Sequence, residues 1–338
     1  MDAESAGELL DLAESRSQDL AGADAKESLE QLEARSDELM AAIAWFLDNG
    51  CPDEALRLAN ALYRFWITSR RFDEGAHWFD RVLESEGGAE GLRGRAYLSA
   101  GFMPFWLGDD DRAAFLFGRA LDAGRELEDP ALTSQALGGL ARVELRADVA
   151  EGRRLAREAF EVSDAAGDDP GRSNALHLLG VGAQIAGDLL EARDWMTQRL
   201  ALVRAMGNDF LVASEASNLS MVERQIGNLE TAEDLAHEAI RICETIGDRF
   251  TTPFAMAGLA AIALERGDHA RSAKLVGAVE GLMEAAQMAW PPDERPHYER
   301  ILAELPKAMG RGEFERMRRV GLLMPPAEAV ALALNATG

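Results

Sequence analysis

Apolar residues recur along the chain at the spacing of an α-helix. Between residues 176 and 186, for example, apolar side chains step by three or four residues and so share one stripe of a helix. The alternation of β-branched and polar residues that is typical of strands is absent. The pattern predicts an all-α fold with essentially no sheet.

Turn signals separate the helical stretches at regular intervals. Gly-Asp or Gly-Asn pairs begin at Gly187, Gly227 and Gly267, in steps of 40 residues, and a second series with the same step lies between them. A glycine can take the left-handed conformation just past one helix, and the following Asp or Asn can cap the next one. Each repeat therefore reads as a helical hairpin, and we expect its internal turns near residues 70, 108, 147, 187, 227 and 267.

A small residue follows each of these turns at a constant offset. Two antiparallel helices approach closely only where the side chain at their crossing is small. The residues expected at the crossings are Gly75, Ala113, Gly152, Ala192, Ala232 and Ser272.

The repeats are predicted to cover residues 52–288. Residues 1–51 are expected to form N-terminal capping helices, and residues 289–338 C-terminal capping helices, because the end units of a solenoid must close an open core. The stretch Ala25–Asp48 has the pattern of one long amphipathic helix. A break is expected at Trp290-Pro291-Pro292.

The hairpin at residues 179–192 resembles a tetratricopeptide repeat. The residues that carry this resemblance are Leu179, Gly180, Gly187, Asp188 and Ala192. The resemblance implies a right-handed α-α superhelix, although the 40-residue period departs from that family's usual period of about 34 residues.

A narrower resemblance extends over most of the chain. The segments that carry it are Leu39–Trp45, Arg64–Trp66, Ala273–Ala278, Pro291-Pro292 and Glu328–Leu334. They resemble the MalT-like helical repeat region of large bacterial transcription regulators, which follows a signal-transducing ATPase domain and often precedes a LuxR-type helix-turn-helix. The resemblance implies a region that senses an inducer or partner and relieves autoinhibition. Both a stand-alone paralogue and a fragment of such a regulator fit this sequence.

The charge balance narrows the choice of partners and compartment. The chain carries 35 basic and 59 acidic residues, a formal net charge of −24. Such an excess of acid argues against a nucleic-acid or anionic-membrane surface, because like charges repel. The first twenty residues lack the apolar core of a signal peptide, and the longest uncharged stretch, Ser173–Gly187, is too short to span a bilayer. We therefore expect a cytoplasmic protein.

The sequence lacks the motifs of catalysis and of cofactor or metal binding. It contains no phosphate-binding GxxxxGK[ST] loop, no HExxH and no GxSxG. Its five histidines fall in different repeats without ligand spacing, and its two cysteines, Cys51 and Cys243, are too far apart in sequence to form a CxxC pair. We expect no enzyme activity, no cofactor and no metal.

The tetratricopeptide resemblance implies that the first helix of each hairpin lines a concave groove. Residues at fixed offsets before each turn would then face a partner. The candidate groove residues are Arg57, Asn60, Arg64, Arg95, Phe102, Trp106, Asn174, His177, Gln184, Asn218 and Arg224.

Arginines and aromatic residues together have the composition of a binding hot spot. Arg57, Arg64 and Arg95 would place positive charge inside an acidic chain, which favours an acidic peptide or an anionic small molecule. The alternative is that these arginines pair with carboxylates of adjacent helices, and that Phe102 and Trp106 only pack between hairpins. Pro104, within the same helix, should kink it.

Two functions remain open from the sequence. One is a non-catalytic sensor module that binds a protein, a peptide or a small molecule in its groove. The other is a plain protein–protein scaffold, with self-association as one form. An enclosed pocket would favour the sensor, whereas an extended open face would favour the scaffold.

Overall fold

The computed structural model describes residues 1–20, 25–286, 288, 290 and 295–335. Within these residues every regular element is an α-helix and no strand is present, which confirms the all-α prediction. The chain forms two compact units, Met1–Ala186 and Gly187–Gly338. We refer to them as unit 1 and unit 2.

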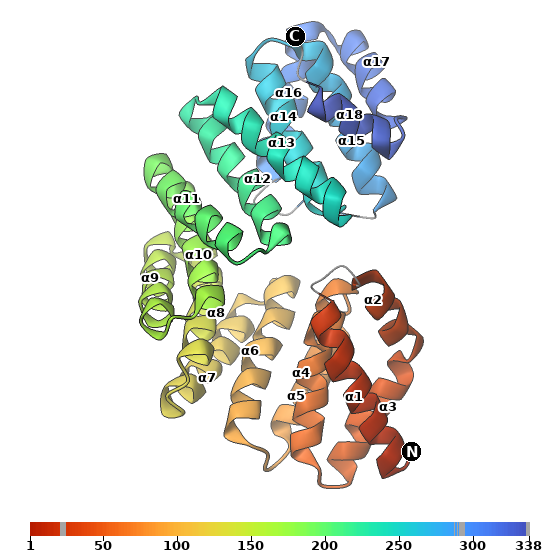
Figure 1. Ribbon diagram of the computed structural model, residues 1–338, viewed down its shortest axis with the longest axis vertical. Helices are drawn as coiled ribbons and strands as arrows, with labels where there is room; N and C mark the ends of the chain where they lie inside the picture. Colours follow the sequence, from red (N-terminus) through yellow and green to blue (C-terminus); the bar gives the residue numbers. More distant parts are fainter. Residues whose placement is uncertain (21–24, 287, 289, 291–294, 336–338) are drawn as a thin grey trace. The chain divides into compact units, whose positions relative to one another are not determined.

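Unit 1 consists of an N-terminal group of three helices followed by helical hairpins (Figure 1). Its helices are α1 (Ala3–Asp19), α2 (Ala25–Ala34), α3 (Ser36–Asp48), α4 (Pro52–Thr68), α5 (Phe72–Glu84), α6 (Glu90–Leu107), α7 (Asp110–Glu126), α8 (Pro130–Ala147), α9 (Val149–Ala166) and α10 (Asp169–Ala186).

The first helices of successive hairpins form a layer of their own in unit 1. Each first helix packs against its hairpin partner, as α6 does against α7 and α8 against α9. It also contacts the next first helix, so that α4 packs on α6, α6 on α8 and α8 on α10. We call the exposed surface of these four helices the inner face.

Unit 2 continues the same hairpin pattern and ends in three shorter helices. Its helices are α11 (Leu189–Ala205), α12 (Asp209–Ile226), α13 (Leu229–Ile246), α14 (Thr251–Glu265), α15 (His269–Ala285), α16 (Arg295–Met309), α17 (Arg311–Leu322) and α18 (Pro326–Leu334). Here α12 pairs with α13 and α14 with α15, while α12 also contacts α14.

The helices end at the turns that the sequence predicts. Gly108, Gly167 and Gly227 lie just past α6, α9 and α12 with φ values of 83°, 67° and 101°, which are left-handed conformations that glycine adopts without strain. The carboxylate of Asp109 then caps α7 by accepting a hydrogen bond from the backbone nitrogen of Arg112. At Asp148 the turn is shorter, because this residue both ends α8 and caps α9.

The predicted crossing residues lie at close helix contacts. Ala113, Ala192, Ala232 and Ser272 are fully buried. A Cβ on Gly152 would lie 2.8 Å from the backbone nitrogen of Leu145, on the other helix of the hairpin. The small-residue rule is therefore confirmed for these hairpins.

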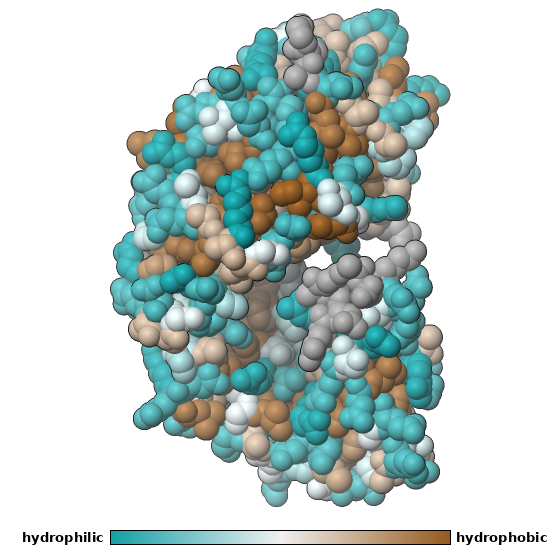
Figure 2. Space-filling model, in the orientation of Figure 1, coloured by the Kyte–Doolittle hydropathy of each residue, from teal (hydrophilic) through white to brown (hydrophobic). Residues whose placement is uncertain are grey.

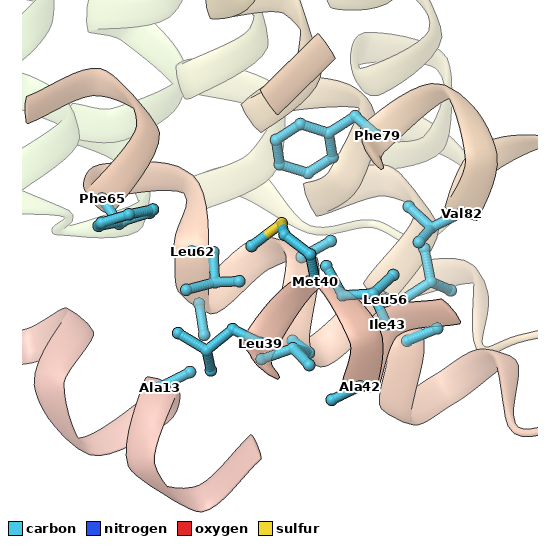
Figure 3. Packing of buried hydrophobic residues seen from close by; sticks show 14 of the residues in the cluster. Ala13, Leu39, Met40, Ala42, Ile43, Leu56, Leu62, Phe65, Phe79 and Val82 are labelled. Carbon is cyan, nitrogen blue, oxygen red and sulfur yellow. The ribbon is translucent and has the colours of Figure 1, made fainter. Parts of the chain in front are cut away.

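Large apolar side chains fill the N-terminal part of unit 1 (Figure 3). Leu39 and Ile43 from α3 pack with Leu56 and Leu62 from α4, and Phe79 and Val82 from α5 close the cluster. Phe79 meets Trp66 edge to face at 5.4 Å between ring centroids. Burial of these side chains holds the first hairpin against α1 and α3.

The prediction of one helix over Ala25–Asp48 is wrong. The segment forms α2 and α3, which are separated at Arg35, a residue with non-helical angles of φ −115° and ψ 13°. The guanidinium of Arg71 donates a 2.6 Å hydrogen bond to the hydroxyl of Ser36 at the start of α3. The break thus coincides with a contact from the first hairpin, 35 residues further along the chain.

The last helices of unit 2 pack closely on its final hairpin. A Cβ on Gly277 of α15 would lie 1.9 Å from the carbonyl oxygen of Arg318 on α17, so these backbones touch. The buried side chains of Arg271 and His237 both contact the carbonyl oxygen of Ala333 in α18, each at 3.0 Å. The division into capping and repeat regions at residues 51 and 288 stays a prediction, and the break expected at Pro291-Pro292 lies outside the described residues.

Candidate functional site

Equivalent positions of the first helices place four side chains in register along the inner face. The thirteenth residues of α4, α6, α8 and α10 are Arg64, Phe102, Arg142 and Val181. Each of these helices contacts the next one, so the four residues occupy equivalent positions of neighbouring helices, and we call them the arginine row.

Charge is divided unevenly between the two layers of unit 1. Beyond their first turns, α4, α6, α8 and α10 contain one carboxylate, Glu144. Their hairpin partners α5, α7 and α9 carry seven over the same part of each helix: Asp80, Glu84, Asp122, Glu126, Glu158, Glu161 and Asp164. The inner layer is therefore poor in negative charge within a chain of net charge −24.

Two positively charged side chains act on a tyrosine next to this row. Burial raises the pKa of Tyr63 to about 12, and the positive charges of Arg64 on α4 and Arg142 on α8 act against that rise. Arg64 is exposed, and within the described residues no carboxylate lies within ion-pairing distance of it.

Aromatic rings continue the cluster from one hairpin to the next. The ring of Phe102 lies 5.7 Å from that of Tyr63 and 5.0 Å from that of the buried Phe117, measured between centroids. Phe102 is half-buried, so it packs between hairpins and also leaves an edge on the inner face. Its expected packing role and its place on the candidate surface are therefore compatible.

Arg142 extends the cluster towards α10. Its guanidinium donates a 2.6 Å hydrogen bond to the side-chain oxygen of Asn174. Gly138 leaves room for this contact, because a Cβ at that position would lie 2.7 Å from the amide nitrogen of Asn174. The structure thus brings Asn174 together with the arginine row, while His177 and Gln184 lie further along α10 as half-buried side chains.

Two of the three arginines predicted to supply positive charge have carboxylate partners. Arg57 makes a bidentate ion pair with Glu14 of α1, with contacts of 2.8 Å and 2.7 Å. Arg95 lies 3.8 Å from Asp129 while its side chain stays 65% exposed. Asn60 donates its amide to the carbonyl oxygen of Leu92 at 3.2 Å. Arg57 therefore pairs with a carboxylate of an adjacent helix, as the alternative interpretation expects, whereas Arg95 makes only a long contact of this kind.

Trp106 lies at the edge of the inner face. Its side chain is 53% exposed and stacks on Phe72 of α5, with a centroid distance of 6.3 Å and an interplanar angle of 18°. Pro104 lies within α6, which continues as far as Leu107. The kink expected at this proline stays a prediction.

The two candidates in unit 2 are engaged in internal contacts. Arg224 is 5% exposed and forms an ion pair with Glu265 of α14, so its predicted place on an exposed face is wrong. Asn218 is half-buried and donates its amide to the buried carboxylate of Glu215. The buried charge of Arg224 is thus neutralised by Glu265 and is not exposed to a ligand.

The sequence reasoning missed Tyr63 and Arg142. An offset taken back from the turn glycine does not reach Arg142, because the third hairpin has Ala147-Asp148 where the others have Gly-Asp or its equivalent. Counting forward from the helix start would have placed Arg142 beside Arg64 and Phe102, because the three occupy the same position in α8, α4 and α6.

The larger of two hollows on the described surface is open to solvent. One of about 570 Å³ lies on α9 beside Arg153, Arg154 and Arg157, and a smaller one of about 220 Å³ lies between α5, α6 and α7. The surface in view is mainly hydrophilic, with separate hydrophobic patches over both units (Figure 2). An open surface of this kind favours an extended partner, which can lie along a helix face, and is less suited to a small ligand, which must be enclosed.

Two features are absent from the described residues. No three or more His, Cys, Asp or Glu side chains gather there in a way that could hold a metal ion. Among the described helices, none combines the length and apolar composition needed to cross a membrane.

No protein-family model matches the chain. It is similar to proteins named as HTH-type transcriptional regulators in Mycobacterium tuberculosis and Mycobacterium bovis, with 28% identity over 225 residues. The match covers 64% of this chain and 25% of those proteins, so the chain spans about a quarter of the length of the curated relatives it matches.

Solved structures with similar folds cover more of the chain. A signal transduction ATPase with a tetratricopeptide repeat sensor from Pyrococcus horikoshii has a TM-score of 0.59 and 14% identity, and the match covers 91% of this chain and 48% of that one. A Rap protein complexed with Competence and Sporulation Factor has a TM-score of 0.54 and 13% identity, over 90% of this chain and 96% of that one. The quorum sensor NprR from B. thuringiensis has a TM-score of 0.54 and 10% identity, over 90% and 98%. The chain therefore has the fold of a tetratricopeptide-like helical repeat protein.

Proposed function

We propose that the chain is a non-catalytic sensor module of a cytoplasmic bacterial transcription regulator. It binds an extended peptide or protein segment on the inner face of unit 1, and the segment carries carboxylates next to apolar side chains. The observation that carries this proposal is that Arg64 and Arg142 occupy equivalent positions of α4 and α8, in a helix layer with one carboxylate beyond the first turns.

The physical reason is a local inversion of charge. The chain as a whole repels anions, yet α4 and α8 carry Arg64 and Arg142 in a layer with one carboxylate beyond the first turns of its helices. Guanidinium groups bind carboxylates through two parallel hydrogen bonds. The aromatic edges of Tyr63 and Phe102 add apolar contact, which selects a carboxylate that is flanked by an apolar residue.

The comparisons supply the regulatory setting of the proposal. Similarity to proteins named as transcriptional regulators supports a role in transcription control. Fold likeness to a tetratricopeptide repeat sensor, and to a Rap protein in complex with a factor, supports binding of a partner by the repeats. The open shape of the larger hollow, on α9, supports a peptide or protein over a small molecule.

Fluorescence anisotropy with a labelled heptapeptide of alternating carboxylate and aromatic or aliphatic side chains tests the proposal. A second peptide, in which each Asp or Glu is replaced by its amide, measures the contribution of the carboxylates. We expect the acidic peptide to bind the full chain at least roughly tenfold more tightly than the amide peptide, a difference of about 1.4 kcal/mol.

The site is tested by the double variant Arg64→Gln with Arg142→Gln. It should weaken binding of the acidic peptide roughly tenfold while circular dichroism shows an unchanged helix content. The matched control is Arg81→Gln with Arg119→Gln, which removes the same charge from the outer helices α5 and α7. An equal loss in the control would show that only long-range attraction is at work, and equal binding of the two peptides would refute carboxylate recognition.

A further inference from the structure

The last helix of unit 2, α18, is seated on three other helices of that unit (Figure 1). It contacts α13, α14 and α15, which are the second helix of one hairpin and both helices of the next. Its side chains Ala329, Val330 and Ala333 are buried. The guanidinium of Arg271 on α15 donates a 3.0 Å hydrogen bond to the carbonyl oxygen of Ala333, in the last turn of α18. This place, which we call the α18 seat, therefore binds a short apolar helix both by its side chains and by its C-terminal end.

The arginine that holds the end of α18 has one counterpart in the other hairpins. Arg271 directly precedes Ser272, the small residue at the helix crossing. The residues at this position in the six hairpins are Glu74, Arg112, Glu151, Glu191, Thr231 and Arg271. Arg112 of α7 is thus the only other arginine in the series. The helices of unit 1 that correspond to the α18 seat are α5, α6 and α7.

These three helices of unit 1 surround the hollow of about 220 Å³. Arg112 and Leu116 of α7 belong to its lining, and Leu116 is buried, as is Leu275 at the same position of α15. Asp109 and Asp268 cap α7 and α15 in the same way, because each accepts a 3.0 Å hydrogen bond from the backbone nitrogen of the arginine. The hollow therefore repeats the α18 seat in its helices, its arginine and its helix cap.

The guanidinium of Arg112 can make the contact that Arg271 makes. One of its nitrogens lies 2.6 Å from the carboxylate of Asp80 on α5, and its side chain is 46% exposed. Arg271 likewise has a carboxylate of the preceding second helix nearby, Glu233 of α13 at 3.5 Å, while its other terminal nitrogen donates to Ala333. A guanidinium has five N–H donors, so one carboxylate partner leaves donors for a helix end. The C-terminal end of a helix carries partial negative charge, which complements this cation.

The surface beside the hollow is apolar where the surface beside the α18 seat is charged. Leu107 lines the hollow and is 49% exposed, and Phe115, whose ring centre is 6.0 Å from the guanidinium of Arg112, is 55% exposed. The equivalent positions in unit 2 hold Arg266 and Lys274. Large apolar side chains exposed at one place are typical of an interaction site, because a partner that covers them removes apolar surface from water.

We propose that the hollow between α5, α6 and α7 is a docking site for a short apolar helix of a partner protein, with the pattern of α18. The small apolar side chains of one helical turn fill the hollow, the last carbonyl groups of the helix accept hydrogen bonds from Arg112, and its flank covers Leu107 and Phe115. Asp80 occupies the position of His237, so Arg112 alone receives the helix end. The site is separate from the arginine row and does not rest on the proposed sensing of an acidic segment.

A fluorescent peptide with the sequence of residues 325–335 is the probe, because it contains the helix that the equivalent seat holds. A helix this short is marginally stable in water, so a lactam bridge between positions 327 and 331, both exposed in α18, keeps it helical. Anisotropy with the full chain should show saturable binding. Val330→Asn, on the buried face of the peptide, should weaken binding roughly tenfold, and Glu328→Gln, on the exposed face, less than about twofold. Equal effects of the two changes, or no binding of the parent peptide, would overturn helix docking.

Variants of the chain locate the bound peptide. Arg112→Gln should weaken binding roughly tenfold, and Ala76→Leu, which fills the hollow, at least as much, while circular dichroism shows an unchanged helix content. The matched control Arg125→Gln removes the same charge from another exposed, ion-paired position of α7 and should change binding less than about twofold. An effect of the control as large as that of Arg112→Gln, or unchanged binding in both Arg112→Gln and Ala76→Leu, would overturn the assignment.

Sedimentation velocity of the chain without peptide distinguishes a partner protein from a second copy. We expect the parent chain and Arg112→Gln to sediment alike. A dimer that Arg112→Gln and Ala76→Leu both dissociate would give the hollow to α18 of a second copy, and would overturn the assignment to a different protein.

Discussion

The first helices of the hairpins differ between the two units in whether their charged side chains are exposed or buried. In unit 1 the inner layer exposes Arg64 and carries few carboxylates. In unit 2 the first helix α12 holds Glu215, which is fully buried, and Arg224, which is 5% exposed, and both are ion-paired. The same hairpin architecture therefore exposes a charged side chain, Arg64, to solvent in unit 1 and buries two ion-paired ones, Glu215 and Arg224, in unit 2.

The difference teaches that a repeat position does not fix the role of the residue that occupies it. Arg64 and Arg224 both lie in the second half of a first helix, yet of the two only Arg224 has a carboxylate of the described residues within reach, on the next first helix. A buried ion pair must be kept whole, because the loss of one partner leaves an uncompensated charge. We therefore expect unit 2 to be sensitive to charge changes and unit 1 to tolerate them.

The chain offers a separate chemical reporter for each unit. Cys51, in unit 1, is partly exposed, whereas Cys243, in unit 2, is buried. Burial, together with the nearby charge of Asp248, raises the pKa of Cys243 to about 12, so its thiol should resist alkylation until unit 2 opens. Labelling of the two thiols along a urea gradient distinguishes the unfolding of one unit from that of the other.

The largest effect is expected from breaking the buried pair of Arg199 and Glu215. The change Glu215→Leu leaves the Arg199 guanidinium, whose side chain is 7% exposed, without this carboxylate, and should cost about 3–5 kcal/mol in the free energy of unfolding. Urea denaturation should show a lower midpoint that coincides with labelling of Cys243. The double variant Arg199→Met with Glu215→Leu should recover most of the loss, and a double variant as unstable as the single one would show that the pair itself is not the cause.

The next effect tests whether the units respond independently. Ala113→Leu overpacks a hairpin crossing in unit 1 and Ala232→Leu one in unit 2, and each should destabilise its own unit by about 1–3 kcal/mol. Because contacts in repeat proteins are mainly between neighbours, the damage should stay local. Earlier labelling of Cys243 in Ala113→Leu than in the parent chain would contradict this separation.

The sequence predicts the hairpins well because their signals are local. Gly227 lies just past α12 in a left-handed conformation, as expected, and Asn228 stands at the N-cap of α13, although its side chain makes no capping hydrogen bond. Contacts between distant residues were beyond such reasoning. The split at Arg35 goes with a hydrogen bond from Arg71, and the burial of Arg224 depends on Glu265, 41 residues later.

The candidate site was predictable in part. The offset before a turn predicts Arg64 and Phe102. It does not predict Tyr63, which lies one position before Arg64 and belongs to the candidate site through its ring contact with Phe102. The pairing of Arg57 with Glu14 joins residues 43 positions apart, from a helix outside the repeats, so periodicity carries no sign of it.

A smaller effect concerns Tyr63, which precedes Arg64 in α4. Its pKa is raised from 10.0 to about 12, which means that the folded state favours the neutral phenol. The resulting stability is complete below pH 10 and is lost as the pH rises towards about 12. In Tyr63→Phe the free energy of unfolding should therefore decrease less between pH 10 and about pH 12 than it does in the parent chain. Arg64→Gln should raise the pKa of Tyr63 further, as measured by tyrosinate absorbance, and a lowered pKa would show that the guanidinium does not act on this hydroxyl.

The smallest expected effect sharpens the comparison of the two arginines. Arg64→Ala removes an exposed side chain with no ion pair to a described carboxylate, and should change the free energy of unfolding by no more than about 0.5 kcal/mol. Arg224→Ala instead leaves Glu265, whose side chain is 34% exposed, without a buried partner, and should destabilise unit 2 clearly more than Arg64→Ala destabilises unit 1. Urea midpoints of the two variants, read with Cys51 and Cys243 labelling, provide the measurement. Equal losses would mean that Arg64 is as structural as Arg224. In that case the exposed charge of unit 1 would belong to the fold, and a ligand on its inner face would have no guanidinium held free for it.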